Sequence, residues 1–311
     1  MSGAIRIGDE VATTGSAGGA LVGLETSVLG QGLPAPHNVE AAERMSSAIR
    51  SVGATPAWIG VVDGDVVVGL SDAELGAFAE PGRSEKVARR DLPAACARGG
   101  LGATTVSATI WAASLAGIRV SATGGIGGVH LSDPRDVSGD LVELARTPGL
   151  LVCSGPKSIL DLEATVERLE ELGVGIFGYR TDTLPHFLAA TSSIEVDRID
   201  DPAHGAAALA AALALGTAST ILLCNPVPAS VAIEAEEVAA AARRAEERAA
   251  SAGIRGRELT PFLLTTLAEE TDGRSLVANL ALLESNARLA AEVAVALSRP
   301  SAHPTDDARG T

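Results

Sequence analysis

Lysine occurs at only two positions in this sequence of 311 residues, Lys86 and Lys157, although Lys and Arg together number 24. Lys157 comes shortly after the apolar run 149–155, at the predicted start of a helix over residues 157–173. An arginine would serve a surface ion pair equally well, but only a partly desolvated lysine can lose its proton and attack carbon. Partial burial and the positive end of a helix dipole both favour the neutral amine. We interpret Lys157 as a candidate nucleophile or Schiff-base former; the alternative is chance survival in a composition rich in Ala and Arg.

Two other charged residues are candidates for chemistry. Glu25 ends the apolar run 19–24, and a carboxyl group in such a position tends to have a raised pKa, which suits a general acid. The alternative is a strand-end Glu paired with an Arg. Lys86 lies in the charged stretch "SEKVARRDLP", which is suited to a phosphate group, although an exposed loop would have the same composition.

The stretch Thr123–His130, "TGGIGGVH", has four glycines in five positions. Such a stretch lets backbone N–H groups approach an anion closely, and a tight connection is the alternative. It does not match G-x-G-x-x-G, and "GPKS" does not match G-x-x-x-x-G-K-[ST], so neither nucleotide-binding fingerprint applies.

A third polar cluster is "DVSGDLVEL", in which Asp136 and Asp140 are four residues apart with Ser138 between them. If a helix begins here, the two carboxylates share one side and could bind a hard cation or a sugar hydroxyl. The alternative is that Asp136 or Ser138 caps the helix. Two acids are too few to enclose a metal, so water and substrate would have to complete the shell of Mg²⁺ or Mn²⁺.

These residues must be positioned by elements in which short apolar runs alternate with helical patterns. The predicted strands cover residues 19–25, 55–62, 65–70, 117–123, 149–155, 173–179 and 219–225, and the predicted helices cover 37–53, 104–117, 157–173, 203–216, 231–253 and 275–298. This rhythm predicts an α/β fold: a mixed, largely parallel central sheet with helices on both faces, in a single domain. The turn Asp63–Asp65 predicts one antiparallel hairpin. We place the domain at residues 18–299, between a flexible N-terminus (1–17) and a disordered tail (300–311).

The composition restricts the partners. There are 39 acidic against 24 basic residues, a formal charge of −15, and such a surface repels polyanions, which argues against DNA or RNA. The three cysteines, Cys96, Cys153 and Cys224, form no CxxC pair and suit a reducing cytoplasm. No signal peptide and no membrane span is recognised. We expect a soluble cytoplasmic protein with a small-molecule substrate, no nucleic acid and no membrane partner.

Eight motifs occur here in the order found in one family. They are "LETSVLGQGLPAPHNVE", "KVARRDLP", "GATTVSAT", "TGGIGGVH", "DVSGDL", "CSGPKSILD", "GYRTDTLP" and "NLALLESNARLAAEVA". Over roughly residues 18–298 the sequence thereby resembles the pseudouridine-5'-phosphate glycosidases, the group that includes the indigoidine-cluster A proteins. The resemblance implies reversible cleavage of pseudouridine 5'-phosphate to uracil and ribose 5-phosphate. Because the bond broken is a C–C glycosidic bond, it cannot be cleaved by protonation of a leaving oxygen. Opening of the ribose ring and formation of an imine at C1' make the cleavage possible.

The resemblance also implies roles for individual residues. Lys157 aligns with the nucleophile that forms the imine, Glu25 with the proton donor, and Asp136 with the ligand of one Mn²⁺ per subunit, for which Mg²⁺ is an alternative. The implied substrate contacts are Lys86 (assigned to the phosphate), the backbone around Val106, His130, the turn Ser138–Gly139–Asp140, and Asn279 near the base or sugar. A homotrimer is implied as well.

Three features depart from the family pattern and bear on the choice of base. Gln31 stands where the pattern has His, the loop 131–135 is about two residues short, and Thr183 and Leu184 replace an acidic and aromatic pair. Alternative functions are a Schiff-base lyase or aldolase acting on another phosphosugar or C-nucleotide, and a non-catalytic phosphonucleoside-binding protein.

Overall fold

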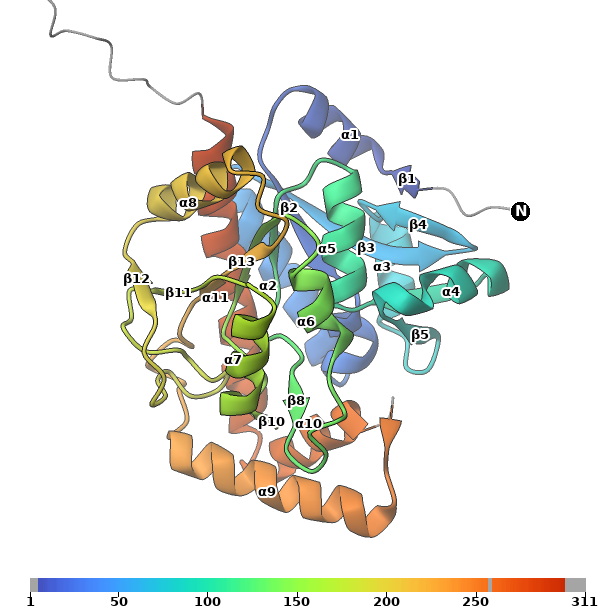
Figure 1. Cartoon of the computed structure of the whole chain (residues 1–311). Helices are drawn as coiled ribbons and strands as arrows, with labels where there is room; N and C mark the ends of the chain where they lie inside the picture. Colours follow the sequence, from blue (N-terminus) through green and yellow to red (C-terminus); the bar gives the residue numbers. More distant parts are fainter. Residues whose placement is uncertain (1–4, 257–258, 300–311) are drawn as a thin grey trace, which may run out of the picture.

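A computed structural model describes residues 5–256 and 259–299 and contains one central sheet covered by helices (Figure 1). Its strands are β1 (Ile5–Ile7), β2 (Leu21–Glu25), β3 (Thr55–Val62), β4 (Asp65–Val68), β5 (Ser84–Val87), β6 (Leu101–Thr104), β7 (Val120–Ala122), β9 (Gly149–Cys153), β11 (Ile176–Tyr179), β12 (Asp197–Ile199) and β13 (Thr220–Cys224). The order along the sheet is β1-β4-β3-β2-β7-β9-β13-β11-β12, with β6 paired to β3 and β5 to β6. All pairs are parallel except β3 with β4 and β3 with β6, so the predicted mixed, largely parallel sheet is confirmed.

The central strands are apolar on both sides because helices cover both faces of the sheet. The helices are α1 (Asp9–Ser16), α2 (His37–Ser51), α3 (Asp72–Phe78), α4 (Leu92–Arg98), α5 (Val106–Leu115), α6 (Gly139–Leu144), α7 (Leu162–Glu171), α8 (Pro202–Ala214), α9 (Ala235–Ala252), α10 (Leu259–Glu270) and α11 (Arg274–Ser298). In β9, Leu150 and Val152 pack with α2, α8 and α11, whereas Leu151 and Cys153 pack with α5, α6 and α7. This alternation is the period-two geometry of a strand buried on both faces.

Strand β3 continues into β4 through Asp63 and Gly64, both with positive φ. The two strands pair antiparallel from Val62 with Asp65 to Ile59 with Val68. A two-residue connection with positive φ at both positions is the turn that suits the twist of a hairpin. The predicted hairpin is confirmed.

The N-terminal segment is more structured than its sequence indicates. Residues 5–16, placed in a flexible N-terminus on sequence grounds, form β1 and α1, and β1 pairs with β4 at the edge of the sheet. The three strand residues are exposed, so burial leaves no pattern in the sequence by which the strand could be recognised. At the other end, the tail 300–311 lies outside the described residues.

Two parts of the chain extend beyond the carboxyl ends of the strands. The short strands β8 (Val129–His130) and β10 (Leu160–Asp161) form a separate antiparallel pair. Helices α9 and α10 pack against each other below the sheet in Figure 1. No helix among residues 5–256 and 259–299 has the length and apolar character needed to span a membrane.

Candidate active site

The site forms where the carboxyl ends of neighbouring parallel strands meet, as expected for an open α/β sheet. Glu25 is the last residue of β2, Thr123 follows β7, and Lys157 lies in the turn between β9 and β10. Strand β7 lies between β2 and β9 in the sheet. Three residues that are far apart in the sequence are thereby placed at one edge.

Glu25 is buried, with 5% of its surface exposed. Desolvation raises the pKa of its carboxyl group; the positive charge of Lys157 and hydrogen bonds from Ser27 and Thr123 oppose the rise. The Ser27 hydroxyl donates to Oε2 and the Thr123 hydroxyl donates to Oε1. No arginine is paired with Glu25 among the described ion pairs, so the alternative of a strand-end Glu paired with an Arg does not hold among the described residues.

Lys157 does not begin a helix, which corrects the sequence interpretation. Helix α7 begins at Leu162, and the side chain of Asp161 caps it by accepting from the Ala164 N–H. Residues 157–161 instead form a turn and strand β10, because the Lys157 N–H bonds the Ile126 carbonyl. The helix-dipole argument for a neutral amine therefore does not apply. What holds the amine is the glycine loop: Nζ donates to the Gly125 carbonyl at 2.6 Å.

The glycine loop 124–128 is a close-packed wall of the site. A Cβ atom at Gly127 would collide with the Ser138 side chain, and one at Gly128 would collide with Thr165. The Gly127 N–H donates to Asp140 Oδ2 at 3.1 Å. The loop is therefore glycine-rich because two segments pack directly on its backbone, which favours the tight-connection interpretation over an anion-binding nest.

Asp140 is buried and holds three segments together. Its Oδ1 accepts from the Ser107 N–H at 3.0 Å, at the start of α5, and its Oδ2 accepts from Gly127. Ser138 is the N-cap of α6, accepting from the Asp140 N–H, which confirms the capping alternative. Asp136 precedes the helix and is exposed. The two carboxylates thus have different surroundings: Asp140 is occupied by backbone donors, and Asp136 is open to solvent.

A cavity of about 280 Å³ brings most of the candidate residues together. Its lining includes the predicted residues Glu25, Lys86, His130, Asp136, Ser138, Gly139, Asp140 and Lys157. Val106, the first residue of α5, is buried and does not line it, although its neighbour Thr105 does. Lys86 reaches the cavity from β5, which pairs with β6, so the alternative of an exposed charged loop does not hold.

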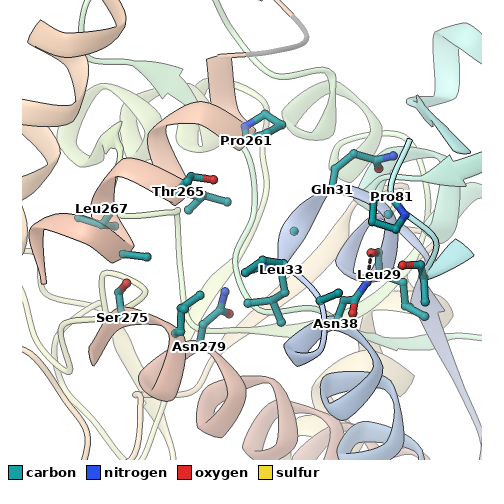
Figure 2. Close-up of a pocket in the computed structure, with 18 of the residues that line it drawn as sticks. Leu29, Gln31, Leu33, Asn38, Pro81, Pro261, Thr265, Leu267, Ser275 and Asn279 are labelled. Atoms are coloured by element: carbon teal, nitrogen blue, oxygen red, sulfur yellow. Dashed lines mark hydrogen bonds between the residues drawn. The ribbon is translucent and has the colours of Figure 1, made fainter. Parts of the chain in front are cut away.

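Asn279 lies elsewhere, on α11. It lines a narrow junction together with Glu25 and Lys157, and it also lines a second cavity of about 340 Å³ (Figure 2). The junction is adjacent to both cavities, because Gly32 and Leu264 line all three spaces. Asn279 therefore shares a cavity lining with Glu25 and Lys157 but not with Asp136 and Lys86.

His130 faces a partner that sequence reasoning did not predict. Its Nδ1 lies 4.0 Å from Oε1 of Glu246 on α9, and both side chains are nearly buried. Neither atom has a hydrogen-bond partner among the described residues.

Asn286 is a second residue that sequence reasoning missed. From α11 its Nδ2 donates to the Thr123 carbonyl at 2.8 Å, and its Oδ1 accepts from Asn225 Nδ2 at 3.0 Å. Thr123 follows β7 and Asn225 follows β13, so one side chain ties two strand ends to the helix. The signal that could have found it was a polar residue within the apolar pattern of the last helix.

Of the departures from the family pattern, Gln31 lines both of the cavities described above. Leu184 is buried with Leu222 and Cys224 in the core under α6 and α7, and Thr183 bridges Glu195 in a loop pair. The loop 131–135 contributes no residue to the linings described above.

The arrangement matches known proteins over nearly its whole length. Residues 10–296 match the profile of the indigoidine synthase A like protein family. The chain is 51% identical over 281 residues to a pseudouridine-5'-phosphate glycosidase of Gemmatimonas aurantiaca, covering 90% of this chain and 92% of that protein. It is 48% identical over 291 residues to a pseudouridine-5'-phosphate glycosidase of Herpetosiphon aurantiacus, covering 93% and 96%.

Two solved structures share the fold. The crystal structure of the prealnumycin C-glycosynthase in complex with ribulose 5-phosphate superposes with a TM-score of 0.87 at 38% identity, over 96% of this chain and 98% of that one. An indigoidine synthase A-like protein from Thermotoga maritima superposes with a TM-score of 0.87 at 39% identity, over 95% and 97%.

Proposed function

The chain belongs to the indigoidine synthase A-like family of pseudouridine-5'-phosphate glycosidases, and we propose that it catalyses reversible cleavage of the C–C glycosidic bond of pseudouridine 5'-phosphate. Water enters and uracil and ribose 5-phosphate leave. The observation that carries the proposal is that the Lys157 amine and the buried Glu25 carboxyl group line the same junction between two cavities.

Lys157 attacks C1' of the sugar, so that a C1'–N bond forms while the bond from C1' to the ring oxygen breaks and the ring oxygen takes up the proton that the amine releases. The lone pair of the nitrogen then forms the imine at C1' as the C–C bond to the base breaks and its electron pair passes to the base, so that no leaving oxygen is needed. Glu25 donates the proton that the departing base carbon needs. The raised pKa of its carboxyl group supports this role, since the acid stays protonated to higher pH than an exposed glutamate. Water then releases ribose 5-phosphate from Lys157.

The substrate lies across the junction in this proposal. The sugar phosphate occupies the cavity of about 280 Å³, with its phosphate at Lys86 and its hydroxyl groups near His130 and the Ser138–Asp140 turn. The base lies toward Asn279. A sugar 5-phosphate site in this fold is supported by the structural relative, a C-glycosynthase solved in complex with ribulose 5-phosphate.

A divalent cation fits one place in this cavity. No group of three His, Cys, Asp or Glu side chains suited to a metal exists among residues 5–256 and 259–299. Asp136 alone offers an exposed carboxylate on the cavity wall, which suits Mn²⁺ or Mg²⁺ that keeps most of its water. A bound cation would supply charge to orient sugar and phosphate oxygens. We also propose a homotrimer, on the family resemblance alone.

A borohydride trap tests the proposal. The protein is incubated with ribose 5-phosphate and Mn²⁺, reduced, digested and mapped by mass spectrometry, while uracil release from pseudouridine 5'-phosphate is followed by chromatography. With only two lysines in the chain, Lys86→Arg serves as the matched control for the Lys157→Arg variant. We expect an adduct on the peptide that carries Lys157, lost only in Lys157→Arg, which keeps the charge but not the nucleophile.

Other outcomes separate the alternatives. An adduct without uracil release indicates a Schiff-base lyase or aldolase acting on another phosphosugar or C-nucleotide. Uracil release without any adduct overturns Lys157 as the nucleophile. Binding of pseudouridine 5'-phosphate that persists in Lys157→Arg, with neither adduct nor cleavage in the native protein, indicates a non-catalytic phosphonucleoside-binding protein.

A further inference from the structure

The turn that carries Lys157 is held from two sides. On one side is the glycine loop, to which Lys157 donates twice: its backbone N–H bonds the Ile126 carbonyl, and its Nζ bonds the Gly125 carbonyl. On the other side is a segment from the connection between β11 and β12, residues 184–189, which we call the bracing segment. It is distant from Lys157 in the sequence, and the proposed chemistry assigns it no role.

Hydrogen bonds fasten the bracing segment to the turn. The Phe187 N–H donates to the Ser154 carbonyl at 2.7 Å. The buried hydroxyl of Ser158 donates to the His186 carbonyl at 2.8 Å and accepts from the Leu188 N–H at 3.3 Å. The turn is thereby bonded at both of its ends to the same short segment.

The two segments are also packed closely. Gly155 has a φ of +82°, and a Cβ atom there would lie 2.0 Å from the carbonyl oxygen of Pro185. Phe187 has a φ of +58°, in the left-handed region that bulky residues rarely adopt. Such a conformation persists only where the surrounding structure imposes it, and the bond from the Phe187 N–H to Ser154 contributes to this. The bracing segment therefore has one fixed position against the turn.

The His186 imidazole bonds the residue that carries the nucleophile. Burial lowers the pKa of this ring, and a hydrogen bond to the Lys157 backbone and the negative charge of Asp161 oppose the change. Nε2 is buried and has no partner among the described residues, so the donor to the Lys157 carbonyl is Nδ1–H. The same carbonyl accepts from the Leu160 N–H at 3.0 Å. Both acceptor positions of this carbonyl are thus occupied.

We propose that His186 is a positioning residue for Lys157: its imidazole donates to the Lys157 carbonyl and fixes the backbone from which the amine reaches the sugar carbon. This inference rests on the proposed function and adds a residue to it. The lysine side chain is a flexible four-carbon stem, so a fixed backbone restricts where Nζ can lie. A misplacement of about 1 Å can slow a reaction about 10²-fold. His186 lines neither cavity nor the junction, so it acts through Lys157 and not on the substrate.

Replacements of His186 separate its hydrogen bond from its volume. His186→Asn keeps an N–H near the position of Nδ1, His186→Gln places its amide near Nε2 instead, and His186→Leu has no donor. Each protein is incubated with ribose 5-phosphate and Mn²⁺ and quenched with borohydride at successive times. The adduct on the peptide that carries Lys157 is measured by mass spectrometry, and the Kd for ribose 5-phosphate is measured by calorimetry.

We expect the rate of adduct formation to fall by about tenfold or more in His186→Leu and His186→Gln, and to stay within about threefold of the native rate in His186→Asn. The Kd should stay within about twofold in all of them, since the substrate contacts come from other elements. A general loss of structure would change Kd as well and would not be rescued by Asn. His204→Leu is the matched control, because His204 is exposed on α8, and both quantities should remain native.

Each outcome decides the inference. A native rate in folded His186→Leu overturns it and leaves the proposed function standing. If His186→Leu does not fold, the other two variants decide: equal rates in His186→Asn and His186→Gln overturn the inference, because only Asn keeps the donor at Nδ1. A weakened Kd with an unchanged rate also overturns it. Absence of any adduct in the native protein overturns Lys157 as the nucleophile and, with it, the role of His186.

Discussion

Oε1 of Glu246 lies 4.0 Å from Nδ1 of His130, and each atom lacks a hydrogen-bond partner among the described residues. The two come from elements far apart in the sequence, strand β8 and helix α9. We expect a small movement of either side chain to close this gap, so that the carboxylate accepts a hydrogen bond from Nδ1–H of the imidazole.

Replacing Glu246 tests this relationship. We expect Glu246→Gln to raise KM for pseudouridine 5'-phosphate by about three- to tenfold, because the carboxylate that faces His130 is lost, with a smaller change in kcat. Glu247→Gln, one position further along α9 and exposed, is the control and leaves both constants unchanged. Equal loss of kcat and kcat/KM in Glu246→Gln would instead show that the residue acts only in the transition state.

The raised pKa of Glu25 predicts a basic limb in the pH profile. Because burial raises this pKa, the carboxyl group keeps its proton above the usual range and loses it as pH rises through the elevated value. Activity that needs the proton therefore falls with rising pH. We expect kcat in the cleavage direction to show this limb in the native protein, and Glu25→Gln to reduce kcat by about 10²–10⁴-fold. A native profile without a basic limb contradicts the donor role.

The same shift predicts an effect of Glu25 on stability. Above the ordinary glutamate pKa the unfolded chain has released this proton while the folded state still holds it, so stability falls as pH rises through that window. Glu25→Gln removes the penalty, and we expect it to raise the free energy of unfolding at pH 8 by about 0.5–2 kcal/mol. Denaturant titrations at pH 4 and pH 8 measure the difference, which should vanish at the lower pH. A destabilised variant at pH 8 would contradict the expectation.

We expect replacement of Asp140 to lower the stability of the fold. Its two oxygens accept from the backbone of α5 and of the glycine loop, so Asp140→Ala leaves two buried N–H groups without acceptors. Each costs about 1–3 kcal/mol, which we expect thermal unfolding to detect as a lower Tm. Asp136→Ala, in the same motif but exposed, should leave Tm unchanged.

Asp136 instead should govern the response to metal. After treatment with a chelator we expect activity to fall and to return with Mn²⁺. In Asp136→Asn the Mn²⁺ concentration for half-activation should rise by about tenfold or more, since a neutral amide is a poorer ligand for a hard cation. Asp133→Asn, in the neighbouring loop and paired with Arg135, is the control. The same Mn²⁺ concentration for half-activation in the two variants would show that Asp136 is not a metal ligand.

The buried part of the sheet was predictable from sequence, because strands such as β9 and β13 are uninterrupted apolar runs between helical patterns. The edge strands were missed or misassigned: β5 is "SEKV", whose charges indicated a loop, and β1 is an exposed "IRI". Their pairing depends on partners distant in sequence and not on a pattern of their own. The start of α7 was misplaced for the same reason, since the glycine loop draws Lys157 into a turn through the Ile126 carbonyl.

The site was predictable to the extent that its residues end strands or carry rare chemistry. Glu25 is the last residue of β2, and Lys157 is one of only two lysines in the sequence. Thr123 and Ser27 hydrogen-bond Glu25. Nothing in the sequence distinguishes them from other hydroxyl residues, because only the fold brings them to Glu25. Glu246 is one of many acids in an amphipathic helix, and only the fold shows that this one is turned inward toward His130. Contacts between residues so far apart in the sequence cannot be recognised from the spacing of residues along it.

Helix α11 packs against α2 and α8 and against strands β2, β7 and β9, and Asn286 fastens it to two strand ends. It is also the last helix of the described chain, so it is synthesised after every strand that it covers. Proteins emerge at about 5–20 residues per second. For several seconds the nascent sheet therefore presents an uncovered apolar face, to which a chaperone can bind before residues 274–298 arrive.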